Sequence, residues 1–143
     1  MAVDQVQRFR LSYGDCDALG IAYFAIYYPW MERAYSSWLH ARGLRSAELA
    51  AQLGTGTVGV RSAATYLAPV RVFDELACEV VQDRVGTTSY TLGFEFTRDG
   101  ELVVHGRMTF ACRDPEGAKA PVPPRLRELI AQLRPGRTGP DEG

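Results

Sequence analysis

Hydrophobic and polar residues alternate along most of the chain's second half, as is typical of strands with one buried face. Four alternating segments lie between Val58 and the region of Cys112, and turn residues separate them: VGVRSAATYLAP, ELACEVVQDRVG, SYTLGFEFTRDG and ELVVHGRMTFACRD. The Asp99-Gly100 pair between the last two segments is a strong hairpin signal. An earlier segment, VQRFRLSY, alternates in the same way and ends at a Gly14–Asp15 turn signal. The pattern therefore predicts five strands.

Residues 25–41 follow a helical period instead. Large apolar residues recur there at steps of three and four: Tyr27, Trp30 or Met31, Ala34 and Trp38. This spacing predicts a helix of about four turns with a broad apolar stripe, which ends near Gly43. Pro29 fits only near the beginning of a helix, so we expect the helix to start close to Phe24. Shorter helices are predicted over residues 46–53 and within the segment APVPPRLRELIAQL.

The order of these elements predicts an α+β fold of one domain. A single long apolar helix among five strands has to be buried, and the concave face of a curled antiparallel sheet is the surface available to it. We assign residues 1–134 to this domain, because 143 residues suffice for one core. Residues 135–143 are polar and rich in turn-forming residues, and we expect this C-terminal tail not to pack.

Composition and charge exclude several classes of function. The net charge of −1 gives no general attraction to nucleic acid or to an anionic membrane. No apolar run is long enough to cross a bilayer, and the first residues lack the layout of a signal peptide, so we expect a cytoplasmic protein. The three cysteines are widely spaced and form no Cys-x-x-Cys pair. We therefore expect neither a disulfide framework nor a metal site.

The segment DCDALGIAYFAIYYPWMERA places two acids and a glycine just before the predicted helix. Peptide N–H groups at a helix start lack partners within the helix and favour negative charge. Gly20 lets the backbone approach a ligand closely. The Asp17 carboxylate precedes these groups by a few residues, so it can face the same reacting carbon as a nucleophile or as a base on water. We interpret Asp15 as a turn residue and Asp17 as the reactive acid, with helix capping as the structural alternative for Asp17.

This segment resembles the signature of the 4-hydroxybenzoyl-CoA thioesterase family, in which an Asp-x-Asp-x-x-Gly loop leads into an aromatic-rich helix start. Three later segments are similar to other parts of the family's sequence: SAATYLAPVRVFDELACEV, DGELVVHGRMTFACRD and PVPPRLREL. The resemblance spans about Val6 to Leu133, nearly the whole chain. It implies the hot-dog fold, in which a curled five-stranded antiparallel sheet wraps a long central helix.

The resemblance also implies roles for individual residues. Asp17 corresponds to the family's catalytic carboxylate, and Phe24 carries the backbone N–H that polarises the thioester carbonyl. The family commonly has Tyr, His or Asn where this chain has Phe24, so a side-chain hydrogen bond to the substrate is absent there and the pocket is drier. The substrate-binding residues that we predict are Gly20, Ile21, Tyr23, Arg61, Ser62 and Arg84.

These binding residues differ in how they are expected to act. Tyr23 lies next to the loop and is expected to line the acyl pocket, whereas the aromatic residues deeper in the helix are assigned to the core. Arg61 and Ser62 are expected to approach the substrate from a neighbouring subunit, and plain sheet pairing is their structural alternative. Arg84 is the only basic residue where some relatives hold the phosphates of coenzyme A with several.

The expected function is hydrolysis of an acyl-CoA thioester, with an aryl or short-to-medium acyl group and without a cofactor. An acyl-carrier-protein thioesterase of a polyketide-type pathway and a non-catalytic acyl-CoA-binding protein remain as alternatives. A hydratase is disfavoured because such relatives use a histidine at the loop–helix junction, and none lies between Asp17 and His40. The fold leaves an open sheet edge, so we expect a homodimer or homotetramer with active sites at the subunit interface.

Overall fold

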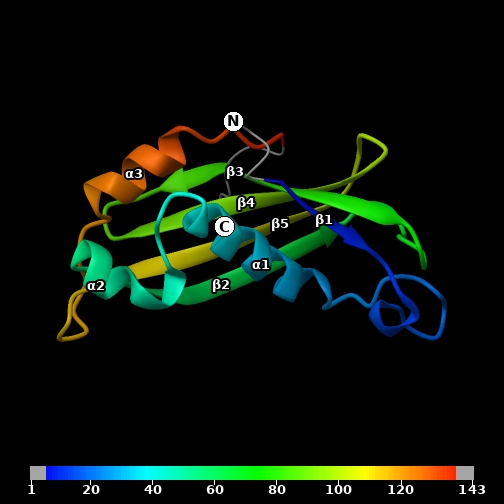
Figure 1. The fold of residues 1–143 in the computed structure, drawn as a ribbon, viewed down its shortest axis with the longest axis horizontal. Helices are drawn as coiled ribbons and strands as arrows, with labels where there is room; N and C mark the ends of the chain where they lie inside the picture. The colour runs from blue at the N-terminus through cyan, green and yellow to red at the C-terminus, as the bar shows by residue number, and fades with distance from the viewer. Residues whose placement is uncertain (1–5, 138–143) are drawn as a thin grey trace.

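The computed structural model describes residues 6–137 and has an α+β fold, as the sequence predicts. Five antiparallel strands form one sheet, in the order β1-β3-β4-β5-β2 (Figure 1). The strands are β1 (Val6–Arg10), β2 (Gly56–Tyr66), β3 (Glu75–Val85), β4 (Ser89–Arg98) and β5 (Glu101–Arg113). The α-helices are α1 (Tyr27–His40), α2 (Leu49–Leu53) and α3 (Pro124–Ala131), with 3-10 turns at Tyr13–Asp15 and Ser46–Glu48.

The core lies between the sheet and α1, which runs across one face of it (Figure 1). Alternate residues of β4 point toward the helix and are fully buried: Tyr90, Leu92, Phe94 and Phe96. Met31 of the helix packs directly against Gly106 of β5, where a Cβ atom would lie 2.2 Å from the Met31 Sδ. Only a glycine at this position lets the helix pack so near the sheet.

The Asp99-Gly100 turn forms the predicted hairpin between β4 and β5. Both residues have positive φ, 52° and 82°, and Arg98 pairs with Glu101 across the turn. A two-residue turn with two positive φ values matches the twist of the flanking strands, which explains why Asp-Gly is favoured there. The register of the hairpin then sets which residues of both strands face the core.

Helix α1 begins at Tyr27, three residues later than the expected start near Phe24. Two tighter turns precede it, in which Ile26 N–H donates to Tyr23 O (3.0 Å) and Tyr28 N–H donates to Ala25 O (3.2 Å). Both bonds join residues three apart, so they close tight turns and the α-helix itself begins only at Tyr27. Within residues 6–137, no helix has the length and apolar character needed to span a membrane.

The expectation that the C-terminal tail does not pack is wrong for residues 135–137; residues 138–143 lie outside the described part. Pro135 forms a parallel bridge with Gln82 of β3, and Gly136 N–H donates to Gln82 O (3.1 Å). The chain then reaches the outer face of the sheet, where Arg137 N–H donates to a Glu95 carboxylate oxygen (2.7 Å). Glu95 is only 2% exposed and also accepts a bond from Arg134 (2.5 Å). A buried carboxylate needs such partners, and this polar segment supplies them.

We expect Arg134→Met to lower the free energy of unfolding by about 2 kcal/mol, because it removes a charged partner of the buried Glu95 carboxylate. Adding Glu95→Gln should restore part of the loss, since a neutral amide needs no cation. The matched control is Arg45→Met, which breaks an exposed ion pair with Glu48 and should cost roughly 0.5 kcal/mol or less. Urea unfolding measures all three variants. Equal losses from the two arginine variants would contradict the assigned role of Arg134.

Candidate active site

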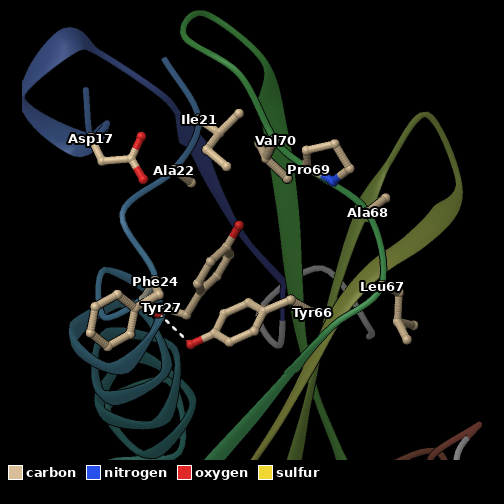
Figure 2. Close-up of a pocket in the computed structure, with 10 residues that line it drawn as sticks. All are labelled: Asp17, Ile21, Ala22, Phe24, Tyr27, Tyr66, Leu67, Ala68, Pro69 and Val70. Atoms are coloured by element: carbon tan, nitrogen blue, oxygen red, sulfur yellow. Dashed lines mark hydrogen bonds between the residues drawn. The ribbon is translucent and has the colours of Figure 1, made fainter. Parts of the chain in front are cut away.

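A pocket of about 320 Å³ opens beside the start of α1 (Figure 2). The loop before the helix forms one side of it, and the chain that follows β2 forms the other. Most of the lining side chains are apolar, and the polar groups come from an aspartate and two tyrosines. The lining residues are Asp17, Ile21, Ala22, Phe24, Tyr27, Tyr66, Leu67, Ala68, Pro69 and Val70.

The Asp17 carboxylate is exposed at the pocket and is held by its own loop. Its Oδ1 accepts a hydrogen bond from Leu19 N–H (2.8 Å), and its carbonyl accepts one from Gly20 N–H (3.0 Å). Gly20 has a φ of +74°, a conformation that favours glycine. Oδ2 of Asp17 has no hydrogen-bond partner among residues 6–137. One oxygen therefore fixes the carboxylate while the other is free for a ligand.

Phe24 lies in the turn that precedes α1, and the residue is 62% exposed. The Tyr66 hydroxyl donates to the Phe24 carbonyl oxygen (2.5 Å), which ties this turn to the end of β2 (Figure 2). The Phe24 N–H has no hydrogen-bond partner in the described part of the chain. A backbone donor without a partner, on a turn that is held in place, can bind an oxygen atom of a ligand.

Asp15 shapes the loop, as its predicted role as a turn residue requires. Its carboxylate accepts a hydrogen bond from Ser12 N–H (2.9 Å), and its carbonyl accepts one from Tyr23 N–H (2.8 Å). Both groups of Asp15 therefore stabilise the backbone on either side of Asp17. Asp15 does not line the pocket.

The opposite wall of the pocket is held by Arg98 and Asp74, which sequence reasoning missed. Arg98 Nη1 donates to Pro69 O (2.9 Å) and to Asp74 Oδ2 (3.0 Å), and the same Asp74 oxygen accepts from Arg71 N–H (2.9 Å). The backbone bond from Arg71 and the Arg98 guanidinium lower the pKa of Asp74. In the sequence, residues 69–74 stand out only as turn residues between two strand segments, and no local spacing connects them with Arg98.

The predicted binding residues fall into two groups. Ile21 lines the pocket and Gly20 belongs to its loop, whereas Tyr23 is 46% exposed and packs against the Phe24 ring outside the pocket lining. Arg61 and Arg84 line a different cleft, of about 420 Å³, together with Val60, Ser89, Thr91 and Thr109. Ser62 is exposed on β2. The single chain therefore does not bring the arginines to the Asp17 pocket.

Tyr27 is a pocket residue that the sequence assigned to the core, and the lining residues after β2 were not predicted either. Its ring belongs to the core, as its helical spacing predicts, but its hydroxyl end reaches the pocket. Periodicity indicates which face of a helix is buried, and it does not distinguish a sealed core from the floor of a cavity.

Residues 11–130 match the thioesterase-like superfamily. The chain belongs to this superfamily. A curated 1,4-dihydroxy-2-naphthoyl-CoA hydrolase from Prochlorococcus marinus (strain NATL1A) is 24% identical over 98 residues, which span 64% of this chain and 65% of that protein. The chain thus matches just under two thirds of this relative's length.

Solved structures of superfamily members have the same hot-dog fold. A thioesterase superfamily protein from Jannaschia sp. CCS1 superposes with a TM-score of 0.79 at 26% identity, covering 94% of this chain and 95% of that one. A gentisyl-coenzyme A thioesterase superposes with a TM-score of 0.72 at 26% identity, covering 85% and 98%. The hot-dog fold expected from the sequence is therefore confirmed.

The lowered pKa of Asp74, which supports the pocket wall, predicts how acid changes the stability of the fold. Because the folded state holds the proton less tightly than the unfolded chain, this ion stabilises the fold fully above the ordinary aspartate pKa of about 3.9. That contribution is lost as the pH falls through the lowered pKa of the folded state. We expect Asp74→Asn to be less stable than wild type by a constant amount from neutral pH to about pH 5, with the gap narrowing below about pH 4.

Urea unfolding at a series of pH values measures this gap. Glu128→Gln is the matched control, because Glu128 is an exposed carboxylate on α3. It should show little difference from wild type at any pH. A gap for Asp74→Asn that stays constant down to pH 3 would contradict the role of the ionised carboxylate.

Proposed function

We propose that this protein hydrolyses acyl-CoA thioesters with an aryl or short-to-medium acyl group. The observation that carries this proposal is the pairing of Asp17 and Phe24 in one pocket, with one carboxylate oxygen and one backbone N–H both lacking partners among residues 6–137. Thioester hydrolysis needs a carboxylate on one side of the carbonyl carbon and a hydrogen-bond donor for its oxygen. Membership of the thioesterase-like superfamily supports the same chemistry.

In the proposed reaction, the Phe24 N–H binds the thioester carbonyl oxygen and stabilises the negative charge that develops on it. One donor of this kind lowers a barrier by roughly 2.7–4 kcal/mol. Asp17 acts either as a base that takes a proton from the attacking water or as a nucleophile that forms an anhydride, which water then cleaves. In both routes the C–S bond breaks, the thiolate takes up a proton, and the products are a carboxylic acid and coenzyme A.

The size and lining of the pocket support an acyl group of limited length. Its volume of about 320 Å³ lies at the low end of the range for small-molecule sites, and its walls are mostly apolar. Two of the matched proteins are named for hydroxylated aryl-CoA substrates, a 1,4-dihydroxy-2-naphthoyl-CoA and a gentisyl-CoA. An aryl group is therefore the first class of substrate to test.

Coenzyme A binding, as we propose it, involves two subunits. Strand β2 is an edge strand of the sheet, and Val58 and Val60 are exposed on it. Arg61 is at the middle of β2, whereas Tyr66 at its end lines the Asp17 pocket. If two β2 strands pair antiparallel in a register that places Arg61 of one subunit opposite Tyr66 of the other, the cleft with Arg61 and Arg84 comes near the partner's pocket. The arginines would then bind the phosphates of coenzyme A.

We expect Asp17→Asn to lower kcat at least a hundredfold, because the amide can neither attack the carbonyl carbon nor take a proton from water. Asp15→Asn is the matched control on the same loop and should retain most activity, since an amide oxygen can still accept the Ser12 N–H bond. Thiol release from benzoyl-, hydroxybenzoyl-, phenylacetyl- and short- to long-chain acyl-CoA measures turnover. Wild-type protein that cleaves none of them, but cleaves carrier-protein thioesters, would replace coenzyme A by a carrier protein as the acyl donor. Turnover of neither would contradict the proposal.

The dimer is tested separately by light scattering. We expect a mass of at least twice 15.8 kDa for the wild type, and a shift toward 15.8 kDa for Val58→Lys, because a lysine on this edge disfavours strand pairing. Turnover should fall together with the mass. Val85→Lys replaces an exposed valine on β3 and should leave the mass unchanged. A stable wild-type monomer would refute the two-subunit site.

A further inference from the structure

The floor of the pocket is formed by Tyr27, the first residue of α1. The residue is only 2% exposed. Its ring contacts three other aromatic rings at centroid distances of 5.2–5.6 Å, those of Trp30, Tyr66 and Phe96. Because the ring is packed on several sides, the position of the hydroxyl is fixed by the fold.

The Tyr27 hydroxyl points away from the helix, into the space between the Asp17–Ala22 loop and Val70 (Figure 2). It has no hydrogen-bond partner in the described residues, and it is not sealed off from the cavity. The other buried tyrosine of α1 behaves differently, since the Tyr35 and Tyr90 hydroxyls bond to each other at 2.7 Å. A buried hydroxyl that faces a cavity without a protein partner is suited to a polar atom of a ligand.

The surroundings of this hydroxyl define what it can bind. The adjacent walls are apolar, formed by Ile21, Ala22 and Val70. Burial raises the pKa of Tyr27 to about 12, so the hydroxyl is neutral near pH 7 and can both donate and accept a hydrogen bond. A group that fits has an apolar body and one uncharged oxygen at its inner end.

We propose that Tyr27 is a specificity-determining residue, whose hydroxyl bonds to a hydroxyl or carbonyl oxygen carried by the acyl group. This inference rests on the proposed thioesterase function, in which the acyl group occupies this pocket. Acyl groups without such an oxygen leave the Tyr27 hydroxyl unpaired, and the enzyme discriminates against them for that reason.

The test compares wild type with Tyr27→Phe on the three monohydroxybenzoyl-CoA esters and on the three methylbenzoyl-CoA esters of matching shape. For at least one position of the substituent, we expect the ratio of kcat/KM for hydroxy over methyl to fall by about ten- to a hundredfold in the variant. The methyl ester itself should be hydrolysed as well as before or better. The Tyr27→Phe protein should also unfold at the same or a higher urea concentration, because no bond within the described protein is lost.

Tyr35→Phe is the matched control, since it removes a hydroxyl from the same helix outside the pocket. It should lower stability through loss of the Tyr90 bond and leave the hydroxy-to-methyl ratio unchanged. An equal loss on all six esters in Tyr27→Phe would mean that the hydroxyl acts on the common thioester or on the fold, and would overturn the proposal. An unchanged ratio at all three positions would overturn it as well.

A binding measurement separates this inference from the proposed function. Calorimetry with the hydroxybenzoates and methylbenzoates, on wild type and Tyr27→Phe, requires no turnover. If the wild type hydrolyses no ester, the thioesterase function fails while a tenfold or greater loss of hydroxybenzoate affinity in Tyr27→Phe still supports the role of Tyr27. Equal affinities of both proteins for every acid would refute that role.

Discussion

The contact between Met31 and Gly106 fixes where the central helix sits on the sheet. A side chain at residue 106 would collide with the Met31 Sδ, so the glycine leaves the space beside β5 that this side chain of the helix fills. Tyr27 is one turn before Met31 and therefore on the same face of the helix. Its ring packs edge-on against Phe96, two residues along β4 from the partner of Gly106. Because Tyr27 and Met31 lie on one face of α1, the contact at Gly106 and the pocket floor are positioned by the same helix.

The catalytic groups that we propose are held differently from this floor. Asp17 and Phe24 belong to backbone turns that are exposed, and hydrogen bonds within the loop and from Tyr66 keep them in position. The wall facing them is joined to the same loop by the Ala22 N–H bond to Val70 O (2.7 Å). Rigid packing therefore sets the shape of the acyl end, while short-range hydrogen bonds set the reacting end. This arrangement allows a substrate to enter from the exposed side and to place its acyl group against the rigid, buried side.

The sequence predicted the elements and the face of each strand better than it predicted what lies across from them. Alternation along β4 places Phe94 inward and Glu95 outward, as found, but nothing in the pattern indicates that residues 134–137 return to cover Glu95. The spacing of Tyr27 indicates a buried ring without showing where its oxygen ends. Arg98 and Asp74 support the pocket wall across 24 residues of chain, a separation that no local motif encodes. Pocket residues on one loop could be predicted from the sequence, whereas those that the sheet brings together could not.

The two edges of the sheet differ in a way that bears on how a second chain joins. On one edge, β1 covers β3 from Glu75 to Glu79, and the C-terminal segment covers it again at Gln82. On the other edge, β2 pairs with β5 and with no other strand of residues 6–137, and two exposed valines lie along it. An uncovered edge of this length favours pairing with another strand. The edge that residues 6–137 leave open is also the one that ends at the pocket through Tyr66, so a strand that covers it would also border the pocket.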